Sequence, residues 1–257
     1  MTGSRSTAGV SKVKETMEAI VGFFDILGYT SFLESNQTED VTESVLRIIN
    51  TIPKIVQAES SLALSAGEDI MAQMHFLVFS DTILMTLDTT GNSRRRKYEQ
   101  WKRFILHSVL LSKNLLINGL PVRGAITNGS IVIQNYCFAG APIVEAYRLC
   151  NSLELAATVI AHSSFAAANE LDHEFGVSFT RFFVEDYPPP MKHEVNRMPI
   201  LLWPTLSTSP FSGTAKEIAR RAFEAWGKRL TGSAPQKLAN TITFFETFRD
   251  VFFGSLN

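Results

Sequence analysis

Two isolated carboxylates stand at the ends of apolar segments, where they could bind divalent cations together. Asp25 follows the apolar run 19–24, and Asp81 lies between the apolar stretches 77–79 and 83–85. A carboxylate beside a buried strand requires a hydrogen bond, a cation or a metal, because an unpaired charge is costly to bury. Two such acids on two predicted strands therefore suggest one shared site.

The elements that would position these acids follow from hydrophobic periodicity and turn residues. The run 19–24 predicts a buried strand that ends at Ile26-Leu27-Gly28, and residues 75–87 predict a hairpin with Ser80-Asp81-Thr82 as its turn. Apolar spacing of three and four predicts amphipathic helices over 36–60 and 101–116, and we expect the basic run 94–97 to precede the first turn of the second helix.

The remaining chain continues the same mixture of strands and helices. Asn128-Gly129 predicts a second hairpin within 120–133, and Pro142 predicts the start of a helix. Further elements are expected as a strand over 156–161, a helix over 163–171, strands over 175–183 and 199–203, and helices from 214 onward. This order predicts an α+β, ferredoxin-like fold with an antiparallel-rich central sheet flanked by helices and a C-terminal helical extension.

Composition narrows the class of protein. The chain has 257 residues, 45% hydrophobic and 19% charged, with a net charge of −1, which is typical of a packed domain and argues against a nonspecific nucleic-acid binder. The two cysteines, Cys137 and Cys150, lack metal-ligand spacing, and no apolar run is long enough to span a membrane. We expect a cytoplasmic protein with a flexible lead-in over 1–17, a catalytic domain over 18–205 and helices over 214–257.

Four segments, in order, resemble the motifs of the class III nucleotidyl cyclase catalytic domain: FFDILGYTSFLE, FSDTILM, LPVRGAITNGSIV and YCFAGAPIVEAYRL. The resemblance covers about residues 18–183. It implies two Mn²⁺ or Mg²⁺ ions held by Asp25, Asp81 and the backbone carbonyl of Ile26. It further implies that Arg148 stabilises charge on the α-phosphate and that the active sites lie at the interface of a head-to-tail homodimer. Residues implied to bind phosphate are Leu27, Gly28, Tyr29 and Arg123.

The departures from the family pattern concern the base and the ribose. Leu77 and Cys137 stand where adenylate-specific members have a lysine and an aspartate that read adenine, and neither can make those charged hydrogen bonds. Val144 replaces the asparagine that orients the ribose. The residues expected near the base, by motif position, are Leu77, Phe79, Cys137, Phe138 and Val144.

This pattern is similar to the pyrimidine cyclases of bacterial Pycsar anti-phage systems. The resemblance implies conversion of UTP to cyclic UMP, which would activate a separate effector protein. Alternatives are a cytidylate cyclase making cyclic CMP, a catalytically inactive cyclase-like protein that binds nucleotide, and an enzyme related to diguanylate cyclases. For Arg123, pairing with a carboxylate is an alternative to phosphate binding. For Arg148, the alternative is pairing on the helix surface.

Overall fold

The strands and helices fall in the predicted mixed order. The computed structural model describes residues 15–36, 74–134, 137–176, 179–193, 197–202 and 213–250, with single positions between 39 and 51. The helix predicted over 36–60 therefore lies largely outside the described residues. The elements are β1 (Glu15–Ile26), α1 (Tyr29–Ser35), β2 (Met74–Phe79), β3 (Thr82–Asp88), α4 (Arg94–Ile117), β4 (Val122–Gln134), β5 (Cys137–Ala139), α5 (Ala141–Ser152), β6 (Thr158–Ile160), α6 (His162–Phe175), η1 (Thr180–Phe182), β7 (Phe183–Tyr187), β8 (Met198–Leu201), α7 (Ala215–Glu224), η2 (Ala225–Gly227) and α8 (Ala234–Thr247).

A single mixed sheet organises these elements. Its order is β2-β3-β1-β4-β6-β8-β7, with β5 paired to the far end of β4. Neighbouring strands among β2, β3, β1 and β4 pair antiparallel, whereas β4 and β6 pair parallel. The order β2-β3-β1-β4 across the sheet matches the ferredoxin-like plan, and the predicted α+β class is confirmed.

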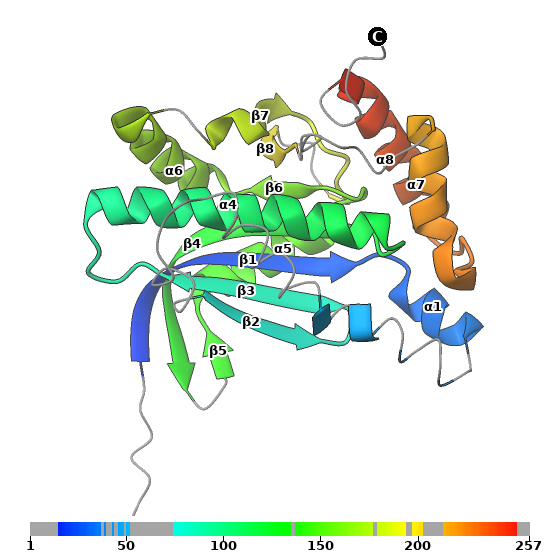
Figure 1. Cartoon of the computed structure of the whole chain (residues 1–257), viewed down its shortest axis with the longest axis horizontal. Helices are drawn as coiled ribbons and strands as arrows, with labels where there is room; N and C mark the ends of the chain where they lie inside the picture. Colours follow the sequence, from blue (N-terminus) through cyan, green and yellow to red (C-terminus); the bar gives the residue numbers. More distant parts are fainter. Residues whose placement is uncertain are drawn as a thin grey trace, which may run out of the picture.

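Helices cover both faces of this sheet, and β1 shows how alternating side chains separate the faces. Gly22 and Phe24 face α4, since a Cβ on Gly22 would lie 3.1 Å from the Phe104 ring. Phe23 faces the other side, where its ring contacts Tyr147 of α5 with centroids 5.5 Å apart. Figure 1 shows α4 crossing one face while α5 lies behind the sheet. Asp25, two residues after Phe23, shares the α5 face.

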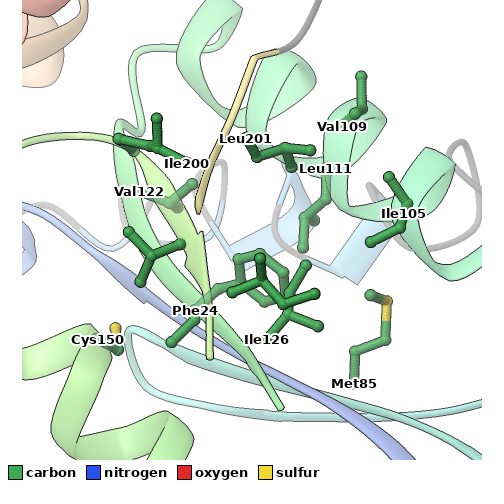
Figure 2. Close-up of a cluster of buried hydrophobic side chains, with 14 of the residues drawn as sticks. Phe24, Met85, Ile105, Val109, Leu111, Val122, Ile126, Cys150, Ile200 and Leu201 are labelled. Carbon is green, nitrogen blue, oxygen red and sulfur yellow. The ribbon is translucent and has the colours of Figure 1, made fainter. Parts of the chain in front are cut away.

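The hydrophobic core lies between the sheet and α4. Phe24 and Ile126 from the central strands have no exposed surface, and they pack among Ile105 and Val109 of α4, as Figure 2 shows. Burying side chains of this size contributes about 1.5–3 kcal/mol each, so this layer fixes the position of β1 and of the acid at its end.

The C-terminal helices join the same core. Thr214 and Glu217 form a capping box that starts α7. In α8, Phe244 and Phe245 are fully buried, and the Thr241 hydroxyl accepts the backbone N–H of Ala156 at 2.9 Å. Figure 1 places α7 beside α1, at the end of β1 that carries Asp25, with α8 packed against α7. These helices are therefore positioned to contribute to a site at that end.

The predicted hairpin at Asn128-Gly129 is wrong. β4 runs through both residues, because they pair with Ile20 and Ala19 of the long strand β1. The Thr127 hydroxyl also donates to the carbonyl of Pro142 at 2.8 Å, which holds β4 against the start of α5. Long-range pairing with β1 thus overrides the local turn preference.

Two smaller predictions also differ from the structure. The basic run begins α4 rather than preceding it, with Ser93 as the N-cap. The positive charge of Arg94 at the start of the helix is neutralised by Glu170 and Glu174 of α6, to which its side chain donates at 2.8 and 2.7 Å. The strand predicted over 175–183 is instead the end of α6, then the short helix η1, and the strand begins only at Phe183.

Candidate active site

Asp25 occupies the last part of β1, at the centre of a row of residues that crosses the sheet. In register it lies between Thr82 of β3 and Arg123 of β4. Its side chain is only 18% exposed, and its Oδ2 accepts a 2.8 Å hydrogen bond from Arg123 Nε. The strand register therefore supplies both the burial of this acid and the cation beside it.

Arg123 is fixed by protein acceptors. Besides Asp25, its guanidinium donates to the Asn151 carbonyl at 3.0 Å, to the Leu153 carbonyl at 3.2 Å and to the Asn151 Oδ1 at 2.8 Å. These contacts join β4 to the end of α5 and leave little of the guanidinium for a ligand. Arg123 therefore pairs with a carboxylate, which is the alternative to phosphate binding.

Asp81 lies beside Asp25, in the turn that connects β2 and β3. The Asp81 carbonyl accepts the backbone N–H of Ile26 at 2.9 Å, which ties this turn to the end of β1. Ser80 has a φ of 55°, a left-handed conformation that favours glycine. Ser80 therefore adopts a turn conformation that glycine would adopt with less strain.

The two acids interact electrostatically. Burial raises the pKa of Asp25 above its usual value, Arg123 opposes that effect, and the charge of Asp81 raises the pKa further. The Asp81 carboxylate has no hydrogen-bond or ion-pair partner among the described residues. The structure therefore brings the two predicted metal-binding acids together and leaves oxygens of both available.

The turn after β1 differs in detail from the expectation that its amides bind phosphate. The Leu27 N–H donates to the Pro121 carbonyl at 2.8 Å, so it is already used. Gly28 is exposed with a φ of 79°, and it begins α1. Tyr29 is buried against Phe32, and burial, followed by the charge of Asp81, raises the pKa of its phenol. Of these three residues, Gly28 is the one that is open to a ligand.

The residues predicted to contact the base lie in three places. Leu77 and Phe79 of β2 are exposed on the sheet face that carries Asp25, in register rows through Leu84 and Thr82. Cys137 and Phe138 pair with the far end of β4, and the stretch from Arg123 to Gln134 spans about 36 Å at roughly 3.3 Å per residue. Val144 is exposed on α5. Cys137 and Phe138 therefore cannot meet a substrate bound at Asp25 of their own chain.

Arg148 makes no hydrogen bond or ion pair with the acids among the described residues. It is one helical turn after Val144 and lines a cavity of about 920 Å³ with Lys192, His162 and Arg197. Among the described residues its guanidinium has no hydrogen bond or ion pair with either acid or with a neighbour on the helix. Asn151, which accepts from Arg123, lines the same cavity, so Arg148 lies on the α5 side of the site without a bond to either acid.

The chemistry of the two acids fits a divalent cation that also binds substrate. The described residues contain no group of three or more His, Cys, Asp and Glu side chains suited to a metal. Mg²⁺ in phosphate-transfer sites is commonly held by one or two carboxylates together with substrate phosphates. Asp25 and Asp81 match that donor set. The Ile26 backbone follows Asp25 directly and is bonded to the Asp81 carbonyl.

Two residues near Asp25 are missed by the sequence reasoning. Asn151 holds Arg123 through both its backbone and its side chain. Lys237 of α8 is close enough to Asp25 and Arg123 for their charges to affect its pKa. Neither lies in a motif, and Lys237 is more than 200 residues from Asp25 in the chain.

Comparisons with known proteins support the fold. The sequence matches no protein-family model and no curated protein. The structure is similar to the adenylyl cyclase CyaB from P. aeruginosa, with a TM-score of 0.50, 14% identity, and coverage of 73% of this chain and 94% of that one. It is also similar to the monomeric guanylyl cyclase domain of the RhoGC fusion protein from the aquatic fungus Blastocladiella emersonii, with a TM-score of 0.51, 11% identity, and coverage of 74% and 97%.

None of the described helices has the length and apolarity of a membrane-spanning segment. The sheet order, the helices on both faces and these solved structures agree on one architecture. The chain therefore has the class III fold of the adenylyl and guanylyl cyclase catalytic domains.

Proposed function

We propose that this protein is a nucleotidyl cyclase that converts a pyrimidine nucleoside triphosphate, UTP, to cyclic UMP and pyrophosphate. The observation that carries the proposal is the convergence of Asp25 and Asp81 at one edge of the site, with Arg123 holding Asp25. The fold of adenylyl and guanylyl cyclases supports it.

The reaction joins the ribose 3′-oxygen to the α-phosphorus while the bond to pyrophosphate breaks and the hydroxyl proton leaves. Asp25 and Asp81 would hold two Mg²⁺ or Mn²⁺ ions, which when bound activate the attacking oxygen and neutralise the leaving pyrophosphate. Arg123 orients the Asp25 carboxylate, and the carbonyl of Ile26 is the third protein ligand that we propose.

A head-to-tail homodimer is part of this proposal. Cys137 and Phe138 lie at the far end of β4 from the acids of their own chain, and we propose that they and Arg148 act on a substrate held by a second copy. Exposed apolar side chains on the α5 side of the sheet support such an interface: Phe79 is 76% exposed, Tyr147 52%, Val144 47% and Leu77 40%. A solvated surface of this composition would be stabilised by burial against a partner.

The preference for a pyrimidine rests on the residues expected to face the base. Leu77 and Val144 offer apolar surface where purine-reading and ribose-binding polar groups would be needed. Leaving a buried polar edge of adenine without partners costs about 1–3 kcal/mol per group, which favours a different base. We further propose that the cyclic product acts as a second messenger in anti-phage defence and binds a separate effector.

The test is to incubate the purified protein with UTP, CTP, ATP or GTP and Mn²⁺ and to measure cyclic products by mass spectrometry. We expect cyclic UMP, and its loss in Asp25→Asn and Asp81→Asn. Glu246→Gln, which changes an exposed acid on α8, is the matched control and should stay active. If cyclic CMP were the main product, the substrate would be CTP and not UTP. Nucleotide binding without any cyclic product would support the catalytically inactive alternative.

A further inference from the structure

A cavity of about 180 Å³ lies between the turn after β1 and the C-terminal helices. Gly28, Thr30 and Ser31 line one side, and Lys228, Arg229 and Lys237 line the other. A water molecule takes about 30 Å³ of liquid volume, so the cavity has room for a small polar ligand. Its lining begins at Leu27, two residues after Asp25, so the cavity lies next to the proposed metal site.

The cavity has an excess of positive charge. Its described lining includes two lysines, one arginine and no carboxylate. Lys228 is committed to the protein, since its Nζ donates to the carbonyls of Gly119 at 2.7 Å and Ala222 at 2.9 Å. Lys237 Nζ donates only to the Ser233 hydroxyl at 3.0 Å, and the Arg229 guanidinium has no partner among the described residues. Two cations are therefore available to a ligand.

Lys237 also connects this cavity with Asp25. Burial lowers the pKa of Lys237, Arg123 lowers it further, and the charges of Glu154 and Asp25 act in the opposite direction. The ammonium group is thus partly desolvated beside another cation, and no carboxylate of the described residues forms an ion pair with it. An anion bound in the cavity would supply the missing counter-charge.

We propose that Lys237 and Arg229 bind the β- and γ-phosphates of the substrate, so that the C-terminal helices complete the triphosphate site. This inference rests on the proposed cyclase function for the identity of the ligand. Pyrophosphate, which carries the same two phosphate groups after the reaction, would leave from this cavity. In this arrangement Lys237 and Arg229 would bind the polyphosphate from one side, and metal ions at Asp25 and Asp81 would bind it from the other.

A purely structural role for Lys237 is the competing explanation. Glu154 Oε1 is buried without a hydrogen-bond partner, and its charge acts on Lys237. Lys237 would then stabilise the fold by neutralising Glu154. This role predicts that replacing Lys237 lowers the melting temperature and leaves polyphosphate binding by the folded protein unchanged.

The first experiment measures binding of inorganic tripolyphosphate by calorimetry without divalent metal, so that neither catalysis nor the acids are required. We expect Lys237→Ala and Arg229→Ala each to weaken binding roughly 10- to 100-fold, as for loss of a charge-assisted contact. Lys237→Arg should restore most of the affinity. The matched control is Lys216→Ala on α7, an exposed lysine outside the cavity, which should bind as the wild type does. Unchanged affinity in Lys237→Ala would overturn the inference.

The second experiment separates this inference from the proposed function. In a cyclase assay, Lys237→Ala should raise KM for UTP about tenfold or more with a smaller effect on kcat. The reason is that Lys237 would contact the phosphates in the bound substrate as well as in the transition state. An active wild type whose KM is insensitive to Lys237 would overturn the triphosphate site and leave the cyclase function standing. A wild type that forms no cyclic nucleotide, but binds tripolyphosphate through Lys237, would overturn the cyclase function and retain the cavity as a polyphosphate site.

Discussion

Replacing Arg123 with methionine should destabilise the protein strongly at neutral pH. The Arg123 side chain is only 9% exposed. Methionine keeps a long apolar side chain but removes the guanidinium. The change leaves the Asp25 carboxylate without its cation and removes the bonds to Asn151 and Leu153. Breaking a buried ion pair by removing one partner costs about 3–5 kcal/mol. Because Asp25 is 18% exposed and water offsets part of that cost, we expect a loss of about 3 kcal/mol at pH 7.

The loss should depend on pH through Asp25. The pKa of this carboxyl is already raised above 3.8 by burial, with Arg123 acting in the lowering direction. Without Arg123 the pKa rises further, so the folded state of the variant holds a proton that the unfolded chain releases above its own pKa. Stability therefore falls as pH rises through the folded-state pKa, and the difference from the wild type shrinks toward pH 4.

The assay is urea unfolding followed by far-ultraviolet circular dichroism at pH 7 and pH 4.5, with tryptophan fluorescence, to which the buried Trp101 contributes, as a second probe. The double variant Asp25→Asn/Arg123→Met should be more stable at pH 7 than Arg123→Met alone, because no buried charge remains. A loss below about 1 kcal/mol at pH 7, or an equal loss at both pH values, would refute the reasoning from the buried pair.

Three further predictions concern the frame of the site. Ser80→Gly should raise the free energy of unfolding by about 0.5–1 kcal/mol in urea melts, because Ser80 has a left-handed φ of 55°. Gly124→Ala should lower it by about 1–3 kcal/mol, since the added Cβ would lie 2.5 Å from the Phe24 ring. Burial lowers the pKa of Lys228 to about 7, below its unfolded value of 10.5, so the unfolded chain binds more protons between these values. Wild-type stability should therefore rise with pH from 7 by up to about 1.4 kcal/mol per unit, and Lys228→Met should lack this contribution, which melts at pH 7, 8 and 9 would measure.

The parts of the fold that follow from sequence are those specified by local pattern. The strand ending near Asp25 and the hairpin around Asp81 have apolar runs and turn residues within a few positions, and both are confirmed. The helix that begins near Pro142 likewise carries its own start signal. These elements are the ones that hold the two acids, which explains why the acids could be paired before the structure was known.

The errors arise where contacts between distant segments of the chain determine the local structure. Asn128 and Gly129 favour a tight turn locally, but twelve residues of β1 pair with β4 and keep it extended. Arg123 could be assigned to a strand, whereas its acceptors on Asn151 and Leu153 depend on how α5 docks. Lys237 lies on a helix that periodicity predicts, but no local pattern states that this helix packs beside the turn after β1. Contacts across most of the chain length supply that information.

The unbroken course of β4 has a geometrical consequence for a symmetric pair of chains. The strand carries Arg123 at one tip and meets Cys137 near the other, so it works as a rigid spacer between the acidic end and the β5 end of each copy. In an antiparallel dimer, the β5 end of each chain would lie at the Asp25 end of the other chain. The length of β4 would then set the distance between the two catalytic centres. Lengthening β4 by a residue pair would shift both centres out of alignment at once.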